Sequence, residues 1–151
     1  MVNLERLVQS FETALAQKCP YVTPGNTSMA TISKGVDCSG LFVAAYKSQG
    51  ASIYHGSNTI ARSHVKELEK LTKASQLVIG SAVFKHKSSG DEPSKYRQDG
   101  LGDYHHIGLV VSTKPLKIIH ASSAKGQVTA DTSIKNWSYC ALLKAVSYPT
   151  G

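Results

Sequence analysis

The sequence has few cysteines, no long hydrophobic run and no excess of acidic residues. Three cysteines occur among 151 residues, and no pair has the spacing of a zinc site, so a disulfide-rich or zinc-stabilised domain is not expected. No stretch approaches the roughly 20 apolar residues of a transmembrane helix. The opening MVNLERLVQSFETALAQK lacks the continuous apolar core of a signal peptide. We therefore expect a protein that is made in soluble form and has no membrane partner.

The charge balance is basic. Seventeen Lys and Arg against ten Asp and Glu give a net charge of +7, which fits an anionic partner: nucleic acid, a membrane surface or an acidic polymer such as a bacterial wall. The basic residues between Lys66 and Arg97 are scattered rather than consecutive, which argues against a nucleic-acid-binding arm. Cys19 and Cys140 are expected to be buried thiols, although a bond between them is an open alternative. The length fits a single domain covering residues 1–151.

Hydrophobic spacing predicts helices first and an antiparallel sheet second, which defines an α+β fold. Leu4, Leu7, Phe11 and Leu15 follow helical spacing, and a second helix is predicted over 58–72. The predicted order is an N-terminal helix within 1–18, a loop over 19–37, helices over 38–73, and strands over 77–148, including 77–85, 106–112 and 116–122. A long polar loop is predicted over 86–104.

The segment GVDCSGLFVAAY places a cysteine where a helix is predicted to begin. Asp37 can cap this helix and Gly50 can end it. A cysteine in a first helical turn lies beside backbone N–H groups and the positive end of the helix dipole, and both favour the reactive thiolate. Cys38 is therefore a candidate nucleophile, provided that a base lies nearby.

Two histidines lie in the hairpin that HIGLVVS and LKIIHAS are predicted to form. His106 and His120 are nearly symmetric about the turn, so they are expected to be directly or diagonally opposite across the two strands. One imidazole could take the proton of a thiol while the second holds the tautomer of the first. A metal site built from His86, His105, His106 and His120 is the alternative, but no acidic residue lies near them at a ligand spacing.

DCSGLFVAAY, followed by HHIGLVV and then IIHASS, resembles the NlpC/P60 family of papain-like cysteine peptidases. The resemblance extends from about Tyr21 to Lys144. It implies a papain-like fold in which a helix carries the nucleophile and an antiparallel sheet carries the bases. It also implies Cys38 as nucleophile, His106 as general base and His120 as the orienting residue. His105 competes with His106 for the role of base.

The resemblance further implies that Tyr21, Asp37 and Ser39 bind substrate. Asp37 could instead be a helix cap alone. The family segment Y-x-W-G-G is replaced by YVTPGNTS, which has no tryptophan and only one glycine, so the role of Tyr21 is less well supported than the roles of Cys38, His106 and His120.

Members of this family typically cleave bacterial wall peptides, commonly between D-γ-glutamate and the diamino acid. The resemblance thus implies a thiol protease that acts as a peptidoglycan endopeptidase through a thioester, without cofactor or metal, as a monomer. Such a protein would reach the wall by release, by a non-Sec route or from a phage. The alternatives are an N-acetylmuramoyl-L-alanine amidase, another Cys-His amidase or acyltransferase, and a catalytically silent wall-binding module.

Overall fold

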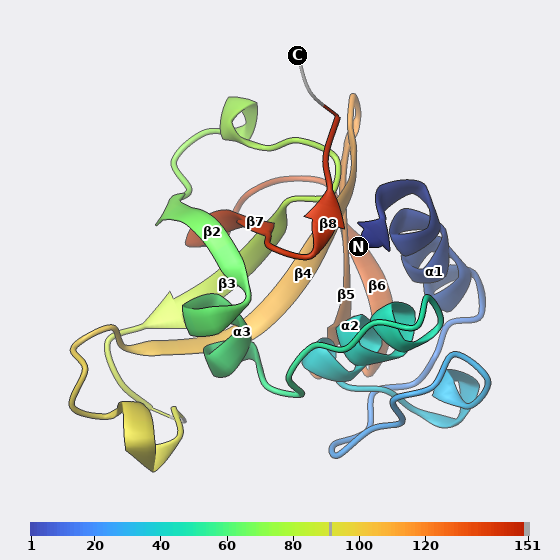
Figure 1. Cartoon of the computed structure of the whole chain (residues 1–151), viewed down its shortest axis with the longest axis horizontal. Helices are drawn as coiled ribbons and strands as arrows, with labels where there is room; N and C mark the ends of the chain where they lie inside the picture. The colour runs from blue at the N-terminus through green and yellow to red at the C-terminus, as the bar shows by residue number, and fades with distance from the viewer. Residues whose placement is uncertain (91, 150–151) are drawn as a thin grey trace.

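Three helices pack on an antiparallel sheet, which confirms the predicted α+β class (Figure 1). The computed structural model describes residues 1–90 and 92–149. Six strands pair in the order β2-β7-β3-β4-β5-β6, and every pair is antiparallel. The strands of this sheet are β2 (Val65–Lys70), β3 (Ala82–Lys87), β4 (Asp103–Thr113), β5 (Leu116–Ser122), β6 (Gln127–Asp131) and β7 (Tyr139–Leu143).

Helix α1 (Leu4–Ala16) matches the predicted N-terminal helix. The Asn3 side chain caps it by accepting a hydrogen bond from the Arg6 amide at 2.9 Å. Its buried face meets helix α2 (Cys38–Lys47), where the rings of Phe11 and Phe42 pack edge to face with centroids 4.8 Å apart. The two helices lie on the same side of the sheet (Figure 1).

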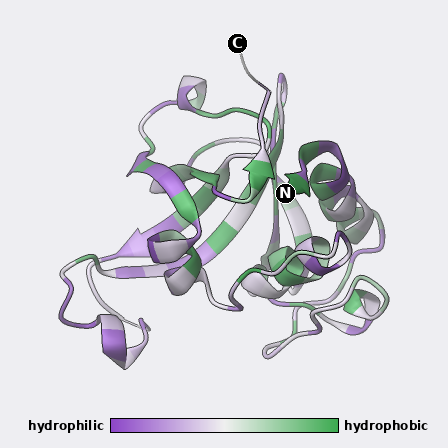
Figure 2. Ribbon diagram, viewed as in Figure 1, coloured by the Kyte–Doolittle hydropathy of each residue, from purple (hydrophilic) through white to green (hydrophobic). Residues whose placement is uncertain are grey.

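The predicted helix over 58–72 is wrong beyond its first half. Helix α3 covers only Ser57–Ser63, and Val65–Lys70 forms strand β2, paired with β7. A β-bulge between Lys66 and Glu69, with Glu67 at φ 56°, breaks the alternation of the strand. The extra residue spaces the apolar side chains by three, which imitates a helix in the sequence. β2 is largely hydrophilic along its length (Figure 2).

The strand boundaries on either side of the polar loop also differ from the prediction. β3 begins at Ala82, five residues after the predicted start, because the chain turns through Gly80 at φ 94°. β3 then runs to Lys87 and β4 begins at Asp103, so the loop is shorter than 86–104 and contains a 3-10 turn over Ser94–Tyr96. The hairpin of β4 and β5 forms as predicted.

The sheet buries residues on both faces. Ile107, Leu109 and Ile119 belong to the core cluster that includes the helices. Val110 and Ile118 belong to a second cluster around Trp137 on the other face. Within residues 1–90 and 92–149, no helix is long and apolar enough to cross a bilayer.

A short parallel pair joins the two ends of the chain. Strand β1 (Val2–Asn3) lies beside β8 (Val146–Ser147), with Val2 opposite Val146. The Val2 amide also donates to the Ala145 carbonyl at 2.8 Å.

Candidate active site

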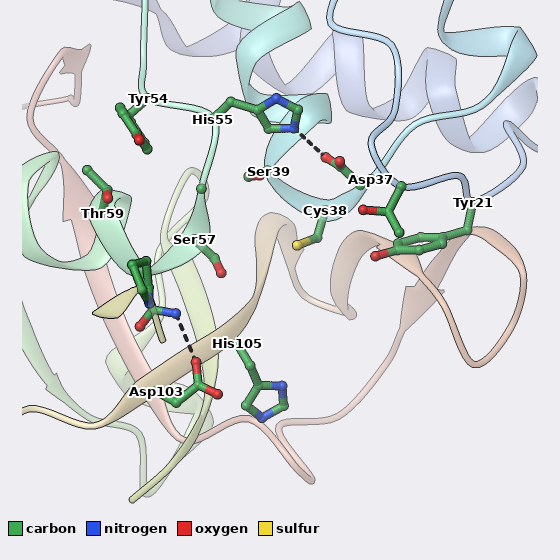
Figure 3. Close-up of a pocket in the computed structure, with 14 residues that line it drawn as sticks. Tyr21, Asp37, Cys38, Ser39, Tyr54, His55, Ser57, Thr59, Asp103 and His105 are labelled. Atoms are coloured by element: carbon green, nitrogen blue, oxygen red, sulfur yellow. Dashed lines mark hydrogen bonds and ion pairs between the residues drawn. The ribbon is translucent and has the colours of Figure 1, made fainter. Parts of the chain in front are cut away.

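Cys38 is the first residue of α2, and its half-buried thiol lies in a cleft of about 350 Å³ (Figure 3). Tyr21, Asp37 and Ser39, the three residues predicted to bind substrate, all line this cleft. The remaining walls come from the loop after α1, from α3 and the segment before it, from the segment between β3 and β4, and from the start of β4. Their lining residues are Thr23, Tyr54, His55, Gly56, Ser57, Asn58, Thr59, Pro93, Asp103 and His105.

Asp37 caps α2, as its position before the cysteine predicts. One carboxylate oxygen accepts from the Gly40 amide at 2.7 Å and the other accepts from the Gly25 amide at 3.1 Å. His55 Nε2 lies 2.8 Å from the first of these oxygens. The carboxylate thus fixes the helix start, the preceding loop and a cleft histidine at once. His55 is a cleft residue that the sequence analysis did not identify.

The Cys38 thiol is protonated in this environment. Burial raises the pKa of Cys38 to about 11, and the Asp37 carboxylate adds to the rise. Hydrogen bonds from the backbone amides of Ile107, Ser39 and Cys38 itself oppose the rise without cancelling it. The first-turn amides of Ser39 and Cys38 lower the pKa, as expected, but burial outweighs them in the resting site. A reactive thiolate requires a base that removes the proton.

His106 and His120 are hydrogen-bonded to each other. His106 Nε2 lies 2.7 Å from His120 Nδ1. The pairing of Leu109 with Ile119 places Gly108 opposite His120, so the two histidines are diagonal neighbours rather than direct partners. The backbone of Ile107, the residue after His106, acts on the Cys38 thiol and lowers its pKa. The backbone next to His106 is therefore in contact with the thiol.

The chain of polar groups continues beyond the two predicted histidines. His120 Nε2 lies 3.1 Å from an oxygen of Asp131, and the other Asp131 oxygen accepts from the Trp137 indole N–H at 2.9 Å. The Trp137 ring stacks on His106, with centroids 5.6 Å apart and planes at 26°. The sequence analysis did not identify Asp131 or Trp137. The sequence does contain a signal for Asp131: Thr129 and Asp131 are two polar residues on the same face of β6.

Both histidines are held neutral. Burial, followed by the neighbouring His120 and Lys85, lowers the pKa of His106 to about 3. Burial also lowers the pKa of His120, although the hydrogen bond to Asp131 opposes that shift. Burial acts against the ionisation of Asp131, but its hydrogen bonds with His120 and Trp137 prevail and lower its pKa. The resting arrangement is a neutral thiol, two neutral imidazoles and one carboxylate.

The competing histidine occupies a different place. His105 is exposed and lines the cleft beside Cys38, whereas His106 faces His120 and Trp137 (Figure 3 shows His105). His105 thus shares the cleft, and His106 shares the hydrogen-bonded chain. The two positions make the choice of base a question that substitutions can answer.

The segment between β3 and β4 is fastened beside the cleft by one arginine. Arg62 on α3 binds Asp99 with its Nε at 2.7 Å and donates to the Gly102 carbonyl at 2.8 Å. Its guanidinium lies 4.2 Å from the centre of the Tyr96 ring. The segment contributes Pro93 to the cleft wall. Arg62 thus helps to position this wall, together with a hydrogen bond between the Thr59 and Tyr96 hydroxyls at 3.0 Å.

The other cysteines do not line the cleft. Cys19 and Cys140 are buried free thiols, as expected, and they are not bonded to each other. In the described part of the chain, no three His, Cys, Asp or Glu side chains are grouped so that they could hold a metal ion.

No protein-family model matches the chain, and no curated protein is significantly similar to it. Solved structures are similar in fold. An NlpC/P60 family protein from Bacillus cereus matches with TM-score 0.62 and 21% identity over 91% of this chain and 39% of its own. The NlpC/P60 domain of the peptidoglycan hydrolase SagA matches with TM-score 0.63 and 18% identity, over 93% of this chain and 98% of the SagA domain. The peptidoglycan hydrolase RipB from Mycobacterium tuberculosis matches with TM-score 0.65 and 18% identity, over 96% of this chain and 65% of RipB.

A cysteine at a helix start, packed on an antiparallel sheet that carries histidines, is the arrangement of papain-like folds. The chain has the NlpC/P60 form of that fold. It spans less than half the length of the Bacillus cereus protein and nearly all of the SagA domain.

Proposed function

We propose that this protein is a peptidoglycan hydrolase, a cysteine endopeptidase that cleaves the D-γ-glutamyl–diamino acid bond of stem peptides. The observation that carries the proposal is the cleft thiol of Cys38 beside the backbone of the His106–His120 pair. The similarity in fold to SagA and RipB, both described as peptidoglycan hydrolases, supports the substrate class. The net charge of +7 would attract the protein to an anionic wall.

The first step needs a base for a neutral thiol. His106 uses Nε2 in its bond to His120, which leaves Nδ1 to accept the proton of Cys38. The thiolate sulfur then bonds to the carbonyl carbon of the substrate, and the carbonyl electron pair moves onto the oxygen. Thiol and imidazole begin neutral, so the ion pair forms only as the reaction starts.

The oxyanion forms at the start of α2. First-turn amides of a helix have no intrahelical acceptor, and the Cys38 amide is one of them. It can donate to the oxyanion, and Tyr21 in the cleft can assist. The carbon–nitrogen bond then breaks, and imidazolium His106 gives its proton to the leaving amine. A water, deprotonated by the same His106, hydrolyses the thioester and regenerates the thiol.

The cleft also offers groups for the free amine end of a stem peptide. Asp37 precedes Cys38 in the chain and Ser39 follows it, and both line the cleft. The Asp37 carboxylate already takes two backbone amides and His55, but a carboxylate has about four acceptor positions, so one position can meet an ammonium group.

The decisive experiment is digestion of soluble muropeptides, with products identified by mass spectrometry. Wild type should leave L-Ala-D-Glu and release the diamino-acid portion, and Cys38→Ala should be inactive. Cys140→Ala, which removes a thiol that does not line the cleft, is the matched control and should retain activity. Release of the whole peptide from the sugar would indicate an amidase instead. No cleavage by a folded wild type would reject the hydrolase and favour a binding module.

A second comparison identifies the base. His106→Gln should abolish turnover, whereas His105→Gln should change mainly KM, because it alters the cleft wall and leaves the His106–His120 pair intact. The reverse pattern would assign the base to His105.

A further inference from the structure

We propose that Asp131 is a positioning residue that sets the tautomers of both histidines and thereby makes His106 Nδ1 the basic atom. The inference rests on the proposed function, because it assigns a role within the same reaction. It extends the Cys–His–His arrangement by a carboxylate that holds the second histidine from behind.

The geometry places Asp131 next to the second ring nitrogen of His120, at ion-pair distance. In the β5–β6 pairing, His120 lies opposite Thr129, and Asp131 is two residues further along the same face. One Asp131 oxygen lies 3.1 Å from His120 Nε2, and His120 Nδ1 lies 2.7 Å from His106 Nε2. The His120 side chain is only 4% exposed, so water has little access to substitute for the carboxylate.

The tautomers follow from the carboxylate. An ionised carboxylate only accepts hydrogen bonds, so His120 Nε2 must carry the proton that faces Asp131. In neutral His120 the other nitrogen, Nδ1, is then an acceptor, and His106 Nε2 must donate to it. In neutral His106 the remaining nitrogen, Nδ1, is therefore bare and can take the Cys38 proton. If residue 131 instead donated a hydrogen bond to His120 Nε2, His120 Nδ1 would carry the proton and donate to His106 Nε2. His106 Nδ1 would then be protonated and could not act as the base.

Trp137 holds the carboxylate and the first imidazole together. Its indole N–H donates to the second Asp131 oxygen at 2.9 Å, which fixes the orientation of the carboxylate. Its ring stacks on His106 and meets His120 edge-on, with centroids 5.0 Å apart in the second contact. Lys85 Nζ lies 5.1 Å from the centre of the Trp137 ring and contributes positive charge beside the carboxylate. The carboxylate is thus ionised and aimed at His120.

The first test needs no turnover. In Cys38→Ala protein with 15N-labelled histidine, NMR should show both histidines protonated at Nε2 and bare at Nδ1. Asp131→Asn keeps the shape, but its amide can donate to His120 Nε2, so both tautomers should invert. Asp131→Glu should restore the wild-type pattern. Glu5→Gln, which removes an exposed carboxylate on α1, is the charge-matched control and should change nothing. Unchanged tautomers in folded Asp131→Asn would overturn the proposal.

The second test reads the reaction. On muropeptides, Asp131→Asn should lower kcat and leave KM nearly unchanged, since Asp131 is absent from the cleft lining. The expected loss is roughly 10- to 1,000-fold, less than the ~10⁴-fold seen where an aspartate holds the basic imidazole directly. Asp131→Glu should recover part of kcat. Equal kcat in wild type and Asp131→Asn would refute the positioning role. A wild type inactive on every wall fragment would refute the proposed function instead, while the NMR result would still decide the tautomers.

Discussion

Acid should destabilise this protein through His106 well before its carboxylates protonate. The ordinary pKa of the imidazole is 6.5, and in the folded protein it is lowered to about 3. As the pH falls below 6.5, His106 binds a proton in the unfolded chain but stays neutral in the folded protein. The free energy of unfolding therefore decreases until the pH reaches about 3. Between pH 7 and pH 5 this amounts to about 2 kcal/mol, a large part of a total that is typically ~5–15 kcal/mol.

Urea denaturation followed by circular dichroism at pH 7 and pH 5 measures the effect. Wild type should lose about 2 kcal/mol more than His106→Gln over this interval. The interval lies above the ordinary aspartate pKa of 3.8, so Asp131, whose pKa is lowered, adds its own loss only at lower pH. Cys38→Ala keeps both histidines and should behave like wild type. An identical pH dependence in wild type and His106→Gln would refute the reasoning.

Three further predictions concern the surroundings of the site. Gly108→Ala places a Cβ 2.9 Å from Trp137 Cη2, so overpacking should cost ~1–3 kcal/mol and lower muropeptide cleavage; wild-type stability in urea would contradict this. Arg62→Met should free the segment between β3 and β4, and trypsin should then cut at Lys95 faster than in wild type; equal cleavage rates by mass spectrometry would count against the clamp. Iodoacetamide should alkylate Cys38 at pH 7 more slowly than a free cysteine peptide, because the Cys38 pKa is about 11; an equal or faster rate would contradict the raised pKa.

Features set by neighbouring residues could be predicted from the sequence. The helix starting at Cys38 and its Asp37 cap depend on a few adjacent positions, and both are confirmed. The hairpin that brings His106 and His120 together depends on a short turn, so the contact could be predicted but its diagonal register could not. The catalytic roles assigned to these residues remain proposals.

Features set by distant parts of the chain were missed or predicted wrongly. Strand β2 contains a bulge whose spacing imitates a helix, and only pairing with β7 reveals the strand. Asp131 meets His120 through the register of two strands, which no spacing in the sequence fixes. The protonation state of Cys38 depends mainly on burial by the whole fold, which outweighs the local effect of the first-turn amides.

The pairing of β1 with β8 brings the first and last strands of the chain side by side. Val2 and Val146 are direct partners, so a linker that replaces the residues after Ser147 could join β8 to β1 without moving either strand. The chain could then be opened at an exposed turn elsewhere, such as Lys114, and a circular permutant should keep the same sheet and cleft.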